Sequence, residues 1–336
     1  MRRPSSRVKT LLAGFFFALA LNTGFPSEGS AQGFRGLVTE CGGGSETLTL
    51  LCHNAALAAD LGRGGLATGT SGGSEVPGSA STMGYRLRGF PRFALSARGG
   101  LARFSMVDLQ RGYGTGGGTA AETDQVILPS LHFSGTLGLF NGFSPQPTVG
   151  GVLSLDLTAS AHKLFLPKSI GFQEGLFGWG VGARLGILRE SFTLPGVSVS
   201  ANHHWMGSAA VGSMDAGGSA EAEFDVDVTS VRGVVGKDFL GVGLLAGAGW
   251  DRLSGAGTVR SRVSPDGPEG TATSSDLSSD RAVFFAGGSM TFIVLQISGE
   301  AGWSYALDQE LPMEPGGDRF PSTKAYFASV AFRVTF

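Results

Sequence analysis

The sequence predicts an all-β fold: a transmembrane antiparallel up-and-down β-barrel of about ten strands, preceded by a small N-terminal helical segment. From residue 92 onward, apolar residues alternate with small or polar ones over many stretches, as in strands with one apolar face. Charged residues make up 15% of the chain, against roughly 25% in an average soluble protein. The second face is mostly glycine, serine, alanine and isolated charges, which suits the narrow interior of a small barrel.

The first 31 residues have the features of a secretory signal peptide. Arg2 and Arg3 begin a basic stretch, and the apolar run "LLAGFFFALAL" (11–21) follows it. This run is too short for a bilayer-spanning helix, which needs about 20 residues. Gly29 and Ala31 supply the small residues for cleavage after Ala31; the alternative is a retained anchor helix. The chain then divides into a signal peptide (1–31), an N-terminal segment (32–91) and a barrel (92–336).

Residues 32–91 lack the strand pattern and are expected to form a periplasmic or plug segment with one helix. Ser45 is a possible N-terminal capping residue, apolar residues follow at helical spacing, and Gly62 ends the pattern. The glycine and serine stretch after it is expected to be a flexible loop. Cys41 and Cys52 are the only cysteines, and an oxidising periplasm favours a disulfide between them. Because a small barrel has little room, we expect this segment at the periplasmic mouth or only partly inserted.

Ten strands are expected, and each is long enough to cross a membrane at a tilt. Their ranges are 92–109, 126–140, 149–163, 177–191, 196–211, 220–236, 239–256, 281–293, 294–306 and 324–336. Twelve strands are the alternative if part of 82–91 also pairs. Tight turns are expected at 193–196, at 236–238 and near Val294, and long polar connections at 110–125, 164–176, 255–280 and 307–323. Short and long connections alternate, as periplasmic turns and outer loops do.

The two faces of these strands predict a membrane-interface belt and a charged lumen. With the first strand running outward, the tryptophans fall toward the outer ends of strands, and tryptophan favours membrane interfaces. The expected belt is Trp179, Trp205, Trp250, Trp303 and Tyr305. The expected lumen-lining residues are Arg98, Asp156, Arg184, Asp225, Asp227, Asp251, Glu300 and Arg333. Their mixed signs favour internal ion pairs and a partly filled lumen over a single-sign selectivity ring.

The chain ends in "KAYFASVAFRVTF", which resembles the C-terminal signal of bacterial outer-membrane proteins. Tyr326, Phe332, Val334 and the terminal Phe336 carry this resemblance. It implies a Gram-negative outer-membrane location, contact with outer-membrane lipids, and recognition of the last strand by the barrel-assembly machinery. An N-terminal segment before the barrel also resembles the hatch of FadL-type transporters. That similarity, and the one to porin-like barrels, is architectural and distant, because no family motif matches residue by residue.

These features predict passive or gated passage of a small solute across the outer membrane. The alternative is a structural or surface-interaction barrel, adhesin-like and without transport. A second alternative is a barrel enzyme, either a protease or a lipid-modifying enzyme. Omptin-type proteases use paired aspartates and an Asp–His pair, and Asp225, Asp227, His203 and His204 suggest such a set, but no Asp–His dipeptide is present. His162 and Ser160 share a strand face, as a lipase would need, yet serine is abundant.

No enzymatic activity is therefore predicted. We assign no catalytic residue, cofactor or metal site from the sequence. His53 adjoins Cys52, but a fourth metal ligand is missing. A net charge of -2 gives no reason to expect a nucleic-acid partner.

Overall fold

A computed structural model describes residues 33–83, 92–109, 122–143, 151–172, 175–192, 194–214 and 219–336. The expected signal peptide (1–31) lies outside these residues, as does most of the stretch (82–91) that would have supplied extra strands. No helix among the described residues is both long and apolar enough to cross a membrane.

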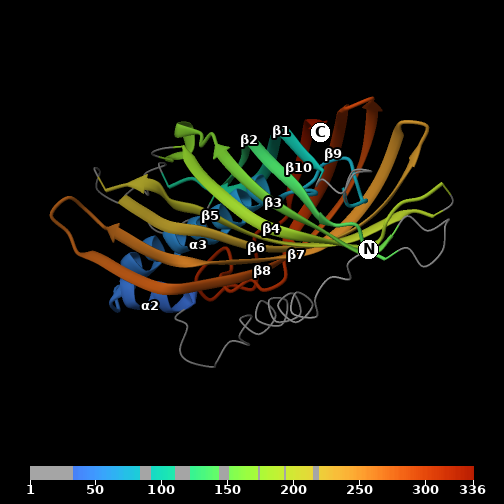
Figure 1. The fold of residues 1–336 in the computed structure, drawn as a ribbon. Coiled ribbons are helices and arrows are strands. Elements are labelled where there is room, and N and C mark those ends of the chain that lie inside the picture. Colours follow the sequence, from blue (N-terminus) through green and yellow to red (C-terminus); the bar gives the residue numbers. More distant parts are fainter. Residues whose placement is uncertain are drawn as a thin grey trace. The chain divides into compact units, whose positions relative to one another are not determined.

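Ten antiparallel strands form a closed barrel in the order β1-β10-β9-β8-β7-β6-β5-β4-β3-β2, which confirms the predicted fold class (Figure 1). The strands are β1 (Phe93–Val107), β2 (Thr123–Phe140), β3 (Val152–Leu164), β4 (Leu176–Leu188), β5 (Gly196–Ser213), β6 (Ser219–Phe239), β7 (Val242–Arg262), β8 (Glu269–Phe292), β9 (Leu295–Ala306) and β10 (Ala325–Thr335). β10 closes the ring by pairing with β1, from Ala94 opposite Thr335 to Arg103 opposite Tyr326. A short 3-10 helix, η1 (Lys168–Ile170), lies between β3 and β4.

The barrel has two unlike ends. We call the end with Phe93, Phe336 and the β6–β7 turn the short-turn end. That turn is Leu240–Gly241, with φ of 51° and 90°, and not 236–238 as expected, because β6 continues to Phe239. We call the opposite end, with the β7–β8 turn (263–268) and the β9–β10 connection (307–324), the cap end. From β6 onward, short turns at the short-turn end (240–241 and 293–294) alternate with longer connections at the cap end (263–268 and 307–324). The expected alternation does not extend to the earlier strands, because the β2–β3 connection (141–151) is as long as the β3–β4 connection (165–175).

The expected long loop over 255–280 is wrong, because most of it is strand. β7 runs to Arg262 and β8 begins at Glu269, so the two form a hairpin that projects beyond the other strands. Its outward residues are mostly polar, and Ala272 and Leu277 on its inner side are buried. Strands were expected to direct an apolar face at lipid, whereas this hairpin has its apolar residues on the inside.

The N-terminal segment forms two helices, α2 (Phe34–Gly42) and α3 (Glu46–Ser71). Ser45 caps α3 as predicted, and its hydroxyl accepts from the Leu48 N–H at 3.5 Å. The predicted disulfide between Cys41 and Cys52 is confirmed and links α2 to α3. α2 lies at the cap end against β7 and β8, and α3 runs inside the barrel (Figure 1). The segment was expected at one mouth of the barrel or only partly inserted; in the structure α3 lies in the lumen and α2 remains at the cap end.

α3 also continues nine residues beyond the predicted end at Gly62, into the stretch expected to be a flexible loop. The glycines there allow the helix to approach the barrel wall. A Cβ on Gly62, Gly65 or Gly69 would lie 2.9, 2.3 or 2.8 Å from Phe224, Phe104 or Leu128, respectively. Such distances are too short for real contacts, so any larger residue would force these rings and methyl groups to move away from the helix.

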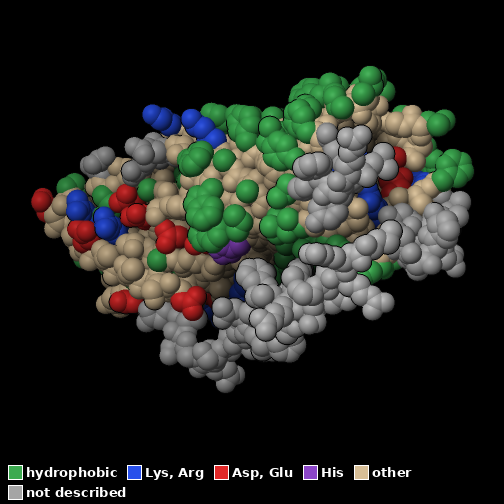
Figure 2. Space-filling view, in the orientation of Figure 1, with side chains coloured by type: hydrophobic (Ala, Val, Ile, Leu, Met, Phe, Trp, Pro, Cys, Tyr) green, Lys and Arg blue, Asp and Glu red, His purple; other side chains and the backbone are tan. Residues whose placement is uncertain are grey.

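The outer surface is apolar toward the short-turn end and polar toward the cap end. Large apolar side chains such as Leu101, Phe133, Phe177, Leu244 and Val330 are exposed on the outside of the ring. In Figure 2, hydrophobic side chains cover much of the middle of the visible face, and charged side chains gather at the left, where Figure 1 shows the β7–β8 hairpin. A contiguous exposed apolar surface on a closed barrel is the pattern of strands that face lipid.

Candidate functional site: the filled lumen

Six of the eight expected lumen residues point inward, and they meet the N-terminal segment. They are Arg98, Asp156, Arg184, Asp251, Glu300 and Arg333. Their partners lie at the end of α3 and in the stretch that follows it, residues 72–83, which we call the strap. The strap continues from the C-terminal end of α3 toward the short-turn end of the lumen.

The other two expected lumen residues, Asp225 and Asp227, lie on the outer face, so that prediction is wrong. Asp225 accepts hydrogen bonds from Ser208 Oγ at 2.6 Å and from the Ala256 N–H at 3.2 Å. The inward residues of this part of β6 are apolar, beginning with Phe224. Toward the cap end, past the apolar outer surface, the outward residues of β6 are polar and its inward residues pack on α3. The polarity of the two strand faces is therefore the reverse of that expected for a strand that faces lipid.

We call residues 72–78, which follow α3 directly, the upper part of the strap, and residues 79–83 its lower part. The upper part is held by one arginine and one glutamate of the barrel wall. Arg98 Nη1 donates to the carbonyl oxygens of Gly72, at 3.2 Å, and Ser74, at 3.1 Å. Glu300 accepts from the backbone N–H of Ser74 at 2.9 Å and of Gly78 at 3.2 Å. Both wall residues therefore bind main-chain atoms, so this recognition does not depend on the side chains of the strap.

The lower part of the strap is held in the same way by an ion pair. Arg184 and Asp156 are paired at 2.8 Å and are almost fully buried. Arg184 donates to the carbonyl oxygens of Ser79 and Ser81 at 3.1 and 2.9 Å, and Asp156 accepts from the Met83 N–H at 3.2 and 3.0 Å. Arg333 Nη1 lies 3.5 Å from the carbonyl oxygen of Pro77. Each buried charge thus has a polar partner, as burial requires.

A third buried pair holds the C-terminal end of α3. Arg232 and Asp251 are paired at 2.7 Å. Arg232 Nη2 donates to the Ser71 carbonyl oxygen at 2.8 Å, and the Ser71 hydroxyl donates to Asp251 at 2.9 Å. Arg232 was not among the expected lumen residues, because the apolar, even-numbered residues of β6 were expected on the lipid side. In the structure these positions face inward, so Arg232 lies on the inner face with Ser230.

Three histidines on three nearby strands also face the lumen. His132 of β2, His162 of β3 and His204 of β5 are buried, with ring centroids 4.7 and 4.8 Å apart in that order. His203 lies on the outside, where its Nδ1 is 2.8 Å from the Thr229 hydroxyl. The sequence did not indicate that the three lumen histidines meet, because the register of β2, β3 and β5 brings them together.

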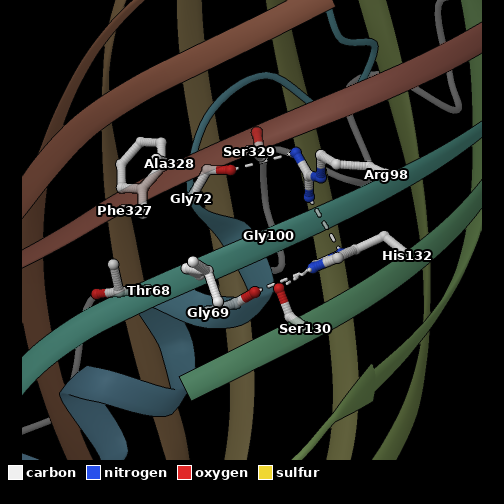
Figure 3. Close-up of a pocket in the computed structure, with 11 residues that line it drawn as sticks. Thr68, Gly69, Gly72, Arg98, Gly100, Ser130, His132, Phe327, Ala328 and Ser329 are labelled. Carbon is white, nitrogen blue, oxygen red and sulfur yellow. Dashed lines mark hydrogen bonds between the residues drawn. The ribbon is translucent and has the colours of Figure 1, made fainter. Parts of the chain in front are cut away.

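A small cavity lies next to these groups. It has a volume of about 10 Å³ and lies between α3, β1, β2 and β10, lined by Gly69, Gly72, Arg98, Ser130 and His132 among others (Figure 3). That is space for about one water molecule. Figure 3 also shows Arg98 directed at both His132 and the Gly72 carbonyl, which joins the wall to the N-terminal segment across the cavity.

The residues of the expected belt lie on the outer surface. Trp179 and Trp205 stack with ring centroids 4.1 Å apart, and Trp303 stacks on Phe284 at 5.7 Å. Trp250 and Tyr305 are half-buried. On β7 the next outward residue after Trp250 is Arg252, and the outward positions beyond it are polar. The aromatic side chain thus lies at the border between the apolar and polar outer surfaces.

Within the described parts of the chain, no three His, Cys, Asp or Glu side chains are grouped so that they could hold a metal ion. No protein-family model matches the sequence, and no curated protein matches it.

Solved structures resemble this chain only in fold. The translocator domain of autotransporter NalP from Neisseria meningitidis is 10% identical with a TM-score of 0.43, over 84% of this chain and 100% of that chain. The transport unit of the autotransporter AIDA-I from Escherichia coli is 13% identical with a TM-score of 0.30, over 84% and 99%. The Pseudomonas putida toluene transporter TodX is 12% identical with a TM-score of 0.28, over 81% and 93%. The chain thus resembles bacterial outer-membrane β-barrels in fold, and the similarity extends no further.

Proposed function

We propose that this chain is a sealed outer-membrane barrel that anchors a disulfide-linked cap at the cell surface. The cap consists of α2, the first turns of α3, the β7–β8 turn (263–268) and residues 307–324. One observation carries the proposal: the N-terminal segment begins in the cap and fills the lumen as far as Met83, near the short-turn end. Short turns face the periplasm in outer-membrane barrels, so the cap is outside.

The strap contacts support a barrel that stays closed. Arg98, Arg184 and Glu300 each make two hydrogen bonds to the strap backbone. Hydrogen bonds to charged groups contribute about 1.5–3 kcal/mol each. Withdrawal of the strap breaks all of them and leaves buried charges to be hydrated. Passive passage of a solute is therefore not what this geometry supports.

The cap contacts support a rigid surface on the outside. Arg35 Nε donates to the Glu310 carbonyl oxygen at 2.8 Å, and His53 Nε2 donates to the Pro312 carbonyl oxygen at 2.8 Å. The disulfide joins the two helices, and a Cβ on Gly270 of β8 would lie 2.0 Å from the Cys41 carbonyl oxygen, so β8 packs directly on α2. Helices, hairpin and connection thus form one unit above the apolar outer surface, where it can meet partners.

Labelling of intact cells tests the orientation and therefore the display role. Asp318→Cys lies in the cap, and Ile293→Cys lies in the β8–β9 turn, where the native side chain is fully exposed. The native cysteines are held in the disulfide and do not react. A membrane-impermeant maleimide should label Asp318→Cys on intact cells and Ile293→Cys only after permeabilisation. Labelling in the opposite sense overturns the proposal, as does steady conductance of the wild-type protein in a planar bilayer.

Gated passage of a small solute is the second candidate. It is favoured by the charged residues that bind the strap, because Arg98, Arg184 and Glu300 would line a polar channel if the strap moved. The hydroxyls of Thr82 and Ser154 are in hydrogen-bond contact, so a Thr82→Cys/Ser154→Cys variant should form a disulfide that fixes the strap to β3. If the barrel is gated, voltage or solute should evoke currents in the wild type, oxidation of this variant should abolish them, and reduction should restore them.

A further inference from the structure

The three lumen histidines form a chain of hydrogen bonds that ends at the strap. Arg98 Nη2 lies 3.1 Å from His132 Nδ1, and His132 Nδ1 lies 2.6 Å from His162 Nδ1. His162 Nε2 lies 3.0 Å from His204 Nδ1, and His204 Nε2 lies 3.8 Å from Glu75 Oε2. Glu75 belongs to the strap, whereas each histidine belongs to the wall. The chain therefore connects a fixed part of the barrel to the segment that closes it.

The partner at the first end determines which nitrogen of each ring carries hydrogen. His132 Nε2 is 3.0 Å from the Gly69 carbonyl oxygen, which only accepts, so this nitrogen donates (Figure 3). His132 Nδ1 is then an acceptor, which agrees with the guanidinium of Arg98 beside it. His162 Nδ1 donates to the same atom, because two acceptors would otherwise face each other at 2.6 Å; the single lone pair of His132 Nδ1 is then shared between His162 and Arg98.

The hydrogens on the remaining ring nitrogens of His162 and His204 follow in the same way. Since His162 donates through Nδ1, its Nε2 accepts from His204 Nδ1. Among the six ring nitrogens of these three histidines, His204 Nε2 is then the one whose protonation no neighbour determines. It is buried without a hydrogen-bond partner among the described residues and is directed at the Glu75 carboxylate. Ser160, whose hydroxyl is 2.9 Å from His162 Nε2, can donate either to that nitrogen or to Glu75.

We propose that His204 and Glu75 form a proton-operated latch on the strap. When His204 Nε2 carries a proton, the imidazolium attracts the buried carboxylate, and the strap stays closed. When the proton leaves, a nitrogen lone pair faces a carboxylate at 3.8 Å in a buried site, and this arrangement is unfavourable. The other two rings cannot absorb the change, because a reversed chain would place an acceptor against the Gly69 carbonyl and a donor against Arg98.

Charged groups on the other strands around His204 do not replace this proton. Arg98 of β1 lies between the histidines and the strap, where it stabilises the Glu75 carboxylate and opposes a positive charge on the rings. On the other side, Arg232 of β6 and Asp251 of β7 both face His204, but they are paired with each other at 2.7 Å, so their effects oppose. Glu75 is therefore the group whose position responds to the charge of His204.

Release of Glu75 acts on the strap at its upper attachment. The neighbouring Ser74 gives its N–H to Glu300 and its carbonyl oxygen to Arg98. The lower attachment through Arg184 and Asp156 contains no histidine. We therefore expect loss of the proton to loosen residues 72–78 first and to leave 79–83 in place.

Hydrogen exchange of the strap, measured by mass spectrometry on the full chain in detergent between pH 4.5 and 8.5, tests the latch. Protection factors corrected for intrinsic exchange should fall at least tenfold over 72–78 as pH rises, with little change over 79–83. Glu75→Gln should abolish this pH dependence and remain protected, because its amide can donate to the neutral His204 Nε2. His203→Gln, on the outer face, is the matched control and should behave as wild type.

Several outcomes overturn the latch. They are wild-type protection over 72–78 that does not change with pH, a pH dependence that persists in Glu75→Gln, or equal loosening of 79–83. Nitrogen-15 spectra of the histidines provide an independent test, because hydrogen on His132 Nδ1 or on His162 Nε2 contradicts the assigned chain. The latch does not depend on the display role, since the orientation of the cap is measured by labelling at Asp318 and is unaffected if the strap proves insensitive to pH.

Discussion

Glu300→Gln tests whether wall charges hold the N-terminal segment in the lumen. The two carboxylate oxygens accept the backbone N–H groups of Ser74 and Gly78 at 2.9 and 3.2 Å in a buried site. Glutamine has the same shape, but one of its two terminal atoms is an NH₂ donor. In the variant, a donor therefore faces a donor at one of the two contacts.

The magnitude follows from these contacts. One hydrogen bond to a charged acceptor is lost, which costs about 1.5–3 kcal/mol, and one buried N–H is left unsatisfied, which costs about 1–3 kcal/mol. These costs overlap, because they concern the same donor, so we expect a loss of about 2–4 kcal/mol in the free energy of unfolding. Glu223→Gln removes an exposed carboxylate from the outer face of β6 and should change stability by about 0.5 kcal/mol or less.

Urea unfolding in detergent micelles, followed by tryptophan fluorescence, provides the measurement. Protease digestion of the folded variant shows in addition whether the strap has become accessible. If Glu300→Gln unfolds within 0.5 kcal/mol of Glu223→Gln, then the carboxylate contributes no more than a surface charge. The account of the lumen as a site that binds the strap backbone would then be wrong.

Three further predictions concern the helices and use the same unfolding assay. Gly65→Val places a Cβ 2.3 Å from the Phe104 ring and should lower the free energy of unfolding by about 1–3 kcal/mol. Gly99→Val is the control, because no atom lies within 4 Å of its Cβ, and it should leave stability unchanged. Equal effects of the two variants would exclude close packing between helix and wall. Cys41→Ser/Cys52→Ser opens a loop with a sequence separation of 11 and should cost about 3 kcal/mol, and an unchanged stability would contradict this. Burial raises the pKa of Asp60 to about 6, against 3.8 in the unfolded chain. The free energy of unfolding should therefore fall by about 1–3 kcal/mol from pH 4 to pH 7, and Asp60→Asn should remove that fall. If the variant loses stability with pH as steeply as the wild type, other groups are responsible.

The sequence predicts the strands well because the two faces of each strand lie in different environments, and their side chains alternate in polarity accordingly. Alternation located all ten, and Ser45 and the two cysteines marked the start and the covalent link of the N-terminal helices. Alternation separates the two faces of a strand, but it does not say which face is inside. For β6 the assumption that apolar residues meet lipid reversed the faces, because near the cap end the apolar environment is α3, inside the barrel.

The strap could not be predicted for a related reason. Its glycines and serines have the composition of a flexible linker, and its structure comes from wall residues far away in the sequence. Arg184 and Ser79, for example, are separated by 105 positions and joined by a hydrogen bond of 3.1 Å. The six charges that lie in the lumen are three basic and three acidic, and their mixed signs predicted ion pairs within the lumen. Asp156 and Arg184 do pair with each other, but Arg98 and Glu300 bind main-chain groups of the strap, which charge patterning alone does not indicate.

The way the strap is bound determines where changes in sequence should alter the seal. Most wall contacts reach strap carbonyl oxygens and N–H groups, so half-buried strap positions such as Ser79 should tolerate other side chains as long as they fit. The wall residues are less replaceable, since each removal leaves main-chain groups unsatisfied in a buried site. The strap also contributes side chains: the hydroxyls of Ser81 and Thr82 bond to the wall, and Glu75 contributes a charge that meets a histidine. Among these side chains Glu75 is the charged one, so it is the position through which protons can act on the seal.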